Sequence, residues 1–213
     1  MFAWFERRLK PTAVPRNPEP PPGLLAFYWH FAGQARGLFA GLFAAGFMLA
    51  LLDSMIPVFI GRVVTLITAG RPETLFASYW PHLAGMALVL LVLRPIALTA
   101  QNIMANQAIA ANVGNLVRWQ SHWHVVRQSW TFFQNDFAGR IANRVMQTGP
   151  SIRESLVALI TAVWYILVYG TSAVVLLARA DLWMALPILI WFAAYHVMLR
   201  IFVPRRKHRA PPP

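Results

Sequence analysis

The sequence predicts an all-α membrane protein with four long transmembrane helices. Hydrophobic residue types make up 58% of the 213 residues and charged types only 12%, whereas a soluble domain carries about 25% charged residues. Several stretches stay apolar for about 20 residues, the length that crosses a hydrocarbon core of ~30 Å. Too little polar surface remains to keep such a chain in water, so a soluble globule is excluded.

The formal net charge of +12 raises one alternative, a nucleic-acid-binding protein. Such proteins gather Lys and Arg on one exposed face to neutralise phosphates. Most of the basic residues here flank apolar stretches instead, which favours a membrane topology and no nucleic-acid partner. Cysteine is absent, so disulfides, thiolate metal sites and cysteine nucleophiles are excluded.

The chain divides into four predicted regions. These are a proline-rich cytoplasmic tail (1–22), an interfacial elbow helix (23–37), a transmembrane domain (38–203) and a basic, proline-rich cytoplasmic tail (204–213). Proline removes backbone donors and favours extended, solvated chain in the tails. The elbow is too short and too polar to span, but its aromatic residues suit the membrane interface.

The four predicted spans follow from the apolar runs of the transmembrane domain. They cover about Leu38–Val58, a stretch from near His82 through Leu93 that includes Arg94 and Pro95, about Leu156–Ala178 and about Leu182–Val203. Most of the 19 basic residues lie before the first span, between the second and third, or after the fourth. The positive-inside rule then places both termini in the cytoplasm, and we expect a multi-pass protein of the bacterial inner (plasma) membrane.

The connection between the second and third spans is long. From Ile96 to Trp130 there is neither proline nor a turn cluster, so one helix of ~52 Å is expected there, longer than the membrane is thick. The return leg from Ser151 to Ala178 is similarly long. The sequence therefore predicts a helical hairpin that projects into the cytoplasm, with its tip at Ser129–Gly139.

The tip carries an aromatic cluster. Its sequence from 132 to 145 reads FFQNDFAGRIANRV and follows Trp130. An ordinary loop between helices is one interpretation, but contiguous exposed apolar residues usually mark an interaction site.

This segment resembles the first intracellular loop of the type I exporter family of ABC transporters, the half-transporters of multidrug and lipid efflux. Pro57–Val64 resembles the end of the family's first span, and Arg179–Trp183 its tight outer hairpin. The resemblance covers about residues 25–203 and implies the first four helices of a six-helix transmembrane domain. Two departures are Thr148, where many members carry Asp, and Gly149-Pro150, which interrupts a helix that is often continuous. The proline is compatible with two arrangements: it starts a helical segment at its first position, or it kinks a longer helix.

The resemblance implies a coupling helix at the tip, which docks into a groove of a nucleotide-binding domain. The residues that match it are Trp130, Phe132, Phe133, Asn135, Phe137, Gly139, Arg140 and Arg144. It also implies the lipid bilayer, a nucleotide-binding domain and a second half-transporter as partners, with ATP and Mg²⁺ bound by that missing domain.

No ATPase motif is present in the chain itself. A P-loop needs a lysine in a Gly-rich turn, whereas the only lysines are Lys10 and Lys207, so no cofactor is assigned to this chain. We expect a fragment of an exporter, truncated before the ATPase domain and inactive alone. The alternative is a standalone four-helix membrane protein with a structural or regulatory role; an intramembrane cytochrome or hydrolase is a third interpretation.

Two ionisable residues lie inside the predicted spans, Asp53 and Arg94. Such residues are costly in lipid and usually functional. They are close enough in depth for a long arginine to reach the carboxylate. A structural ion pair, a contact with substrate in a cavity, and separate partners for each residue all remain open.

Other polar residues carry weaker signals. Histidines at unmatched depths argue against a haem between facing ligands; they are His82, His122, His124 and His196. Four asparagines recur along the second span and its extension, at Asn102, Asn106, Asn112 and Asn115. They suit either a hydrated path or a solvated, helix-contacting face.

Overall fold

The computed structural model describes residues 9–14, 21–69 and 72–209, with side chains described for 9–14, 21–68 and 79–202. Most of the predicted N-terminal tail and residues 210–213 of the C-terminal tail lie outside the described residues. The described part is helical and contains no strand. The predicted all-helical class is therefore confirmed.

The helices occupy the following ranges in chain order. They are α2 (Leu24–Gln34), α3 (Arg36–Ala69), α4 (Pro72–Leu88), α5 (Arg94–Asn102), α6 (Ala110–Val125), α7 (Trp130–Gln134), α8 (Ala138–Trp164), α9 (Thr171–Ala180) and α10 (Leu182–Arg209). Three π-helical segments join them without a break: η1 (Val89–Leu93), η2 (Ile103–Ile109) and η3 (Tyr165–Gly170). Helices α4 to α6 thus form one rod, and α8 with α9 forms a second.

Four helical stretches of the described chain are long and apolar enough to cross a membrane. They are Arg36–Thr68, Tyr79–Val125, Ala138–Ala180 and Leu182–Phe202. The second and third, with 47 and 43 residues, are about 70 and 65 Å long, twice the thickness of a hydrocarbon core. The number of candidate spans agrees with the sequence prediction, and two of them extend well past any membrane.

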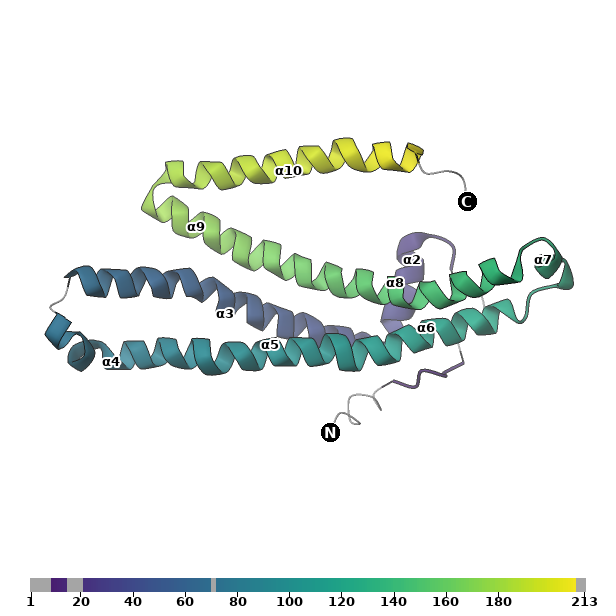
Figure 1. Ribbon diagram of the computed structural model, residues 1–213, viewed down its shortest axis with the longest axis horizontal. Coiled ribbons are helices and arrows are strands. Elements are labelled where there is room, and N and C mark those ends of the chain that lie inside the picture. The colour runs from purple at the N-terminus through teal and green to yellow at the C-terminus, as the bar shows by residue number, and fades with distance from the viewer. Residues whose placement is uncertain (1–8, 15–20, 70–71, 210–213) are drawn as a thin grey trace.

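The rods form a hairpin that ends in α7 (Figure 1). Helix α3 lies antiparallel to α5, α6 lies beside α8, and α10 packs against α9. The end of α3, the start of α4 and the turn between α9 and α10 lie at the end of the molecule opposite α7. At the turn between α9 and α10, Asp181 is extended, and its carboxylate accepts a hydrogen bond from the backbone N–H of Trp183 at 3.0 Å, which caps the start of α10.

Two boundaries differ from the expectation. The first rod ends at Val125 instead of Trp130, because the chain turns over residues 126–129 to direct α7. Helix α10 continues to Arg209, past the predicted end of the transmembrane domain at 203.

Helix α8 is continuous through Pro150. Of the two expectations for this proline, a new helical start is therefore wrong, and a position inside a longer helix is what the structure has. Proline lacks the N–H that would bond to the carbonyl four residues earlier, here Met146. In the structure Arg118 of α6 donates its Nε–H to that oxygen at 3.4 Å. A neighbouring helix thus supplies a donor for the freed carbonyl, as in other proline-containing membrane helices.

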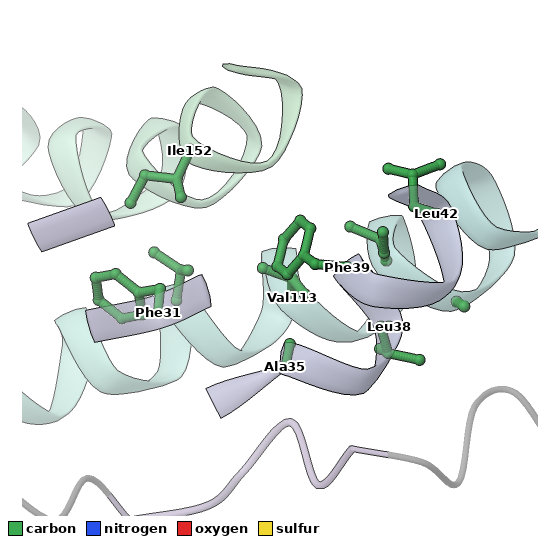
Figure 2. Packing of buried hydrophobic residues seen from close by; sticks show 10 residues of the cluster. Phe31, Ala35, Leu38, Phe39, Leu42, Val113 and Ile152 are labelled. Atoms are coloured by element: carbon green, nitrogen blue, oxygen red, sulfur yellow. The ribbon is translucent and has the colours of Figure 1, made fainter. Parts of the chain in front are cut away.

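The buried core lies where the elbow and the two rods meet. Figure 2 shows side chains from α2, α3, α6 and α8 packed there; the cluster comprises Phe31, Ala35, Leu38, Phe39, Leu42, Ala108, Ile109, Val113, Val117 and Ile152. Beyond this cluster, large apolar side chains of the spans are exposed, for example Leu91 at 75% and Trp191 at 61%. Such an exterior suits contact with lipid.

Helices α6 and α8 cross at a glycine. A Cβ built on Gly149 would lie 2.6 Å from the backbone oxygen of Gly114, whereas a Cβ built on Gly114 would meet nothing within 4 Å. The Cα of Gly149 therefore faces the backbone of α6 closely, whereas the Cβ position of Gly114 points into open space. Gly149 is what permits the close approach of the two rods.

We predict opposite effects of alanine at these two glycines. Gly149→Ala forces the rods apart and should lower the free energy of unfolding by about 1–3 kcal/mol, the usual effect of overpacking. Gly114→Ala should be neutral or stabilising by up to about 1 kcal/mol, because alanine favours the helix. SDS-induced unfolding in mixed micelles, followed by circular dichroism, measures both; equal losses would contradict the crossing described.

Candidate functional site

The hairpin tip presents aromatic side chains outward. Trp130 is 75% and Phe137 80% exposed, and the rings of Phe132 and Phe133 pack edge to face with centroids 5.4 Å apart. No residue of α7 is buried. Ser129 and Phe137 have extended backbones on either side of α7, so the chain changes direction before and after the short helix.

One carboxylate holds the base of α7 to the start of α8. Asp136 accepts a hydrogen bond from Arg140, and its other oxygen lies 3.6 Å from the guanidinium of Arg144. The guanidinium of Arg140 also lies over the ring of Phe137, 5.9 Å from its centroid. Two arginines thus neutralise one aspartate, and the tip keeps an excess of positive charge.

Asp136 is a site residue that the sequence analysis missed. Its spacing of four residues from Arg140 is the signal that would have found it, because side chains four apart on or beside a helix are neighbours. Asn135, which the resemblance also matched, ends α7, and its backbone N–H donates to the oxygen of Thr131 at 3.2 Å. Gly139 is not crowded, since a Cβ at this position would meet nothing within 4 Å.

An apolar cavity of about 350 Å³ lies behind the aromatic tip. It is lined by His122, Val125, Val126, Phe133, Ala138, Ile141, Ala142, Val145 and Met146. Phe133 lines this cavity from α7, so the tip helix faces residues of both α6 and α8 across it.

Asp53 and Arg94 form an ion pair between α3 and α5, the first of the arrangements left open by the sequence. The Nε–H of Arg94 donates to Oδ1 of Asp53 at 2.7 Å. Directly after Arg94 comes Pro95, which cannot continue the helical hydrogen-bond ladder. The preceding turn is π-helical, with the N–H of Arg94 bonded to the oxygen of Val89. Such a turn shifts the register of the helix, and Arg94 projects from it toward α3.

A reciprocal amide pair joins the elbow to the first rod. Gln34 Nε2 donates to Oε1 of Gln120 at 3.1 Å, and Gln120 Nε2 donates to Oε1 of Gln34 at 2.7 Å. Gln120 is 5% exposed and also donates to the oxygen of Ala13 at 3.5 Å. The elbow and residues 9–14 are therefore both hydrogen-bonded to the same residue of α6. The sequence offered no signal for this pair, because its members are 86 residues apart.

The four asparagines of the first rod do not share one environment. Asn112 is buried and its amide donates to the oxygen of Ala108 at 2.8 Å, whereas Asn102, Asn106 and Asn115 are exposed. Within the described residues, no group of three His, Asp or Glu side chains could hold a metal ion.

Comparison with known proteins gives one informative relationship. No family model matches the chain, and no solved structure matches it. A curated protein of Haemophilus influenzae, named "Uncharacterized ABC transporter ATP-binding protein", is 29% identical over 205 residues.

The chain is similar to part of an ABC transporter protein. The similarity covers 96% of this chain and 33% of the relative, so the chain spans about a third of the relative's length. This relationship, together with four candidate membrane spans, supports a membrane protein with a role related to ABC transport.

We predict that the pair of Asp53 and Arg94 stabilises the contact of α3 with α5. Asp53→Arg should lower the free energy of unfolding by about 3 kcal/mol, because it places two like charges in an apolar setting. Exchanging both residues, Asp53→Arg with Arg94→Asp, should restore most of the loss. The same SDS titration measures this; absence of any recovery in the exchanged variant would show that pairing is not what the two residues contribute.

Proposed function

We propose that this chain is the transmembrane portion of an ATP-driven ABC exporter, in which the hairpin tip transmits closure of a nucleotide-binding domain to the membrane spans. The observation that carries the proposal is the exposed aromatic tip on two rods longer than a membrane. The similarity of nearly the whole chain to an ABC transporter protein supports it.

The tip has the composition of a docking surface. Aromatic residues and arginine are enriched where protein interfaces are strongest, and both occur on and beside α7. Asp136, held by Arg140 and Arg144, fixes the direction of the turn into α8. A partner that binds α7 therefore pushes on α8 as well as on α6.

The rods transmit that push over a long distance. Their backbones touch at Gly149, so a displacement of one is passed to the other. Further along, the ion pair between Asp53 and Arg94 ties α3 to the first rod. Movement of the tip then changes the arrangement of three spans at once, which is what alternation between inward and outward access requires.

The chemistry of ATP belongs to a partner in this proposal. The chain carries no P-loop, so ATP and Mg²⁺ are bound by a nucleotide-binding domain, and two half-transporters form the complete exporter. In the proposed topology, the hairpin tip and both termini face the cytoplasm.

We predict the orientation of the hairpin from cysteine accessibility. The chain has no cysteine of its own, so an introduced cysteine is the one thiol that can be labelled. The unmodified chain serves as the negative control. Asn135→Cys at the tip should react with a membrane-impermeant maleimide only in inside-out vesicles, and Thr68→Cys near the end of α3 only in intact cells. The reverse pattern would exclude coupling to a cytoplasmic ATPase.

We predict that the aromatic tip controls ATP hydrolysis in a chimera. In it this chain replaces the matching third of the Haemophilus protein, and the chimera is reconstituted in lipid nanodiscs. Replacing Phe132 and Phe133 by alanine should reduce ATP hydrolysis about tenfold, since buried aromatic contacts of this kind contribute more than 1 kcal/mol.

The control is Trp183→Ala, an exposed aromatic residue at the opposite end of the molecule (76% exposed, against 39% and 38% for Phe132 and Phe133). It should leave the rate within about twofold, because it lies outside the docking surface. Equal rates in the tip and control variants would favour the alternative, a standalone four-helix protein.

A further inference from the structure

A second cavity lies on the hairpin at the level of the elbow. It has a volume of about 430 Å³ and is open to the surface between residues 11–12, α6 and α8. Its lining residues are Pro11, Thr12, Asn115, Arg118, Trp119, His122, Val145 and Met146. The tip helix α7 contributes nothing to it, so it is separate from the docking surface.

The elbow defines the depth of this cavity. Gln120, adjacent in sequence to the lining residue Trp119, is the residue to which Gln34 of the elbow is bonded. An aromatic helix of this length lies in the plane of the membrane interface. Under the proposed function, the cavity therefore opens at the depth of the lipid headgroups of the inner leaflet.

Arg118 gives this cavity its positive charge. The single hydrogen bond that the structure gives to Arg118 joins its Nε to the oxygen of Met146, so the terminal nitrogens of the guanidinium keep their capacity to donate to an anion. His122 and the exposed Asn115 also line the cavity. None of the described residues that line the cavity is acidic.

Nearby acidic side chains are already neutralised by other arginines. Glu154 of α8 pairs with Arg153 at 2.7 Å, and Asp136 at the tip is held by two arginines. No carboxylate in the described part of the hairpin competes for Arg118. Its charge is available to a ligand.

Apart from Thr12, the rest of the lining is apolar. The indole of Trp119, together with Val145, Met146 and Pro11, forms the wall. A free inorganic anion would leave this wall in contact with water. A phospholipid fits both the arginine and the apolar wall. Its phosphate binds the guanidinium, and the glycerol and the first methylenes of its acyl chains cover the wall.

We propose that this cavity binds the headgroup of an anionic phospholipid, with Arg118 as the principal phosphate ligand. The inference rests on the proposed function only through the membrane depth that it assigns to the elbow. The bound lipid contacts residues 11–12, α6 and α8 together. It thereby joins the N-terminal segment to both rods where Arg118 supports the proline-containing turn of α8.

The test measures which phospholipid the purified chain retains. The chain is equilibrated in mixed micelles with equal amounts of phosphatidylglycerol and phosphatidylcholine, and native mass spectrometry gives the ratio of the two bound lipids. The unmodified chain should prefer phosphatidylglycerol. Asn115→Asp should reduce this preference about tenfold, because a carboxylate in the cavity repels phosphate and leaves the bond of Arg118 to Met146 in place.

Two further variants separate the site from general charge. Arg118→Gln should remove the preference as well, and its unfolding curve shows whether the fold is retained. Arg127→Gln is the matched control, since this arginine lies over the ring of Trp123 at 3.9 Å and does not line the cavity. It should leave the preference unchanged.

Three results would overturn the proposal. They are equal retention of both lipids by the unmodified chain, a loss in Arg127→Gln as large as in Asn115→Asp, and displacement of phosphatidylglycerol by excess inorganic phosphate, which would indicate a free-anion site. Each is independent of the cysteine labelling and of ATP hydrolysis. A failure here thus leaves the proposed function standing, whereas a reversed orientation of the tip would remove the proposed function itself.

Discussion

The close contact between α6 and α8 is the constraint on which the hairpin depends. Two rods of about 70 and 65 Å extend beyond the membrane and pack against each other along α6 and α8. Their backbones approach until a Cβ at Gly149 would collide with the oxygen of Gly114. Small residues permit this approach in membrane helices, where packing rather than hydrophobic burial drives association. The core around Val113 and Ile152 then forms beside the crossing.

The same crossing explains why a proline is tolerated inside α8. Pro150 frees the carbonyl of Met146, and Arg118 reaches it only because α6 lies so close. The arginine that supports the turn also faces the cavity beneath the elbow. One side chain therefore links the continuity of α8 to the surroundings of the membrane interface.

The elements could largely be predicted from the sequence, because each depends on local composition. Apolar runs of sufficient length give helices, and the long run without proline after Pro95 predicted that the first rod extends past the membrane. The aromatic exposure of α7 also followed from its sequence. The boundary at Val125 and the continuity of α8 through Pro150 could not be predicted in this way, because both depend on how the chain turns and on a neighbouring helix.

The sequence by itself determined the class of the protein: helical, too apolar for water, and long enough to cross a membrane four times, because transfer into lipid depends on the sum of local side-chain contributions. Only the tertiary structure decided which residues meet. Asp53 pairs with Arg94 across 41 positions, where the sequence left other arrangements open, and Gln34 pairs with Gln120 across 86 positions, where the sequence offered no signal. Such pairs depend on helix register, which the π-helical turn before Pro95 alters, and on the close approach that a single glycine allows between two rods.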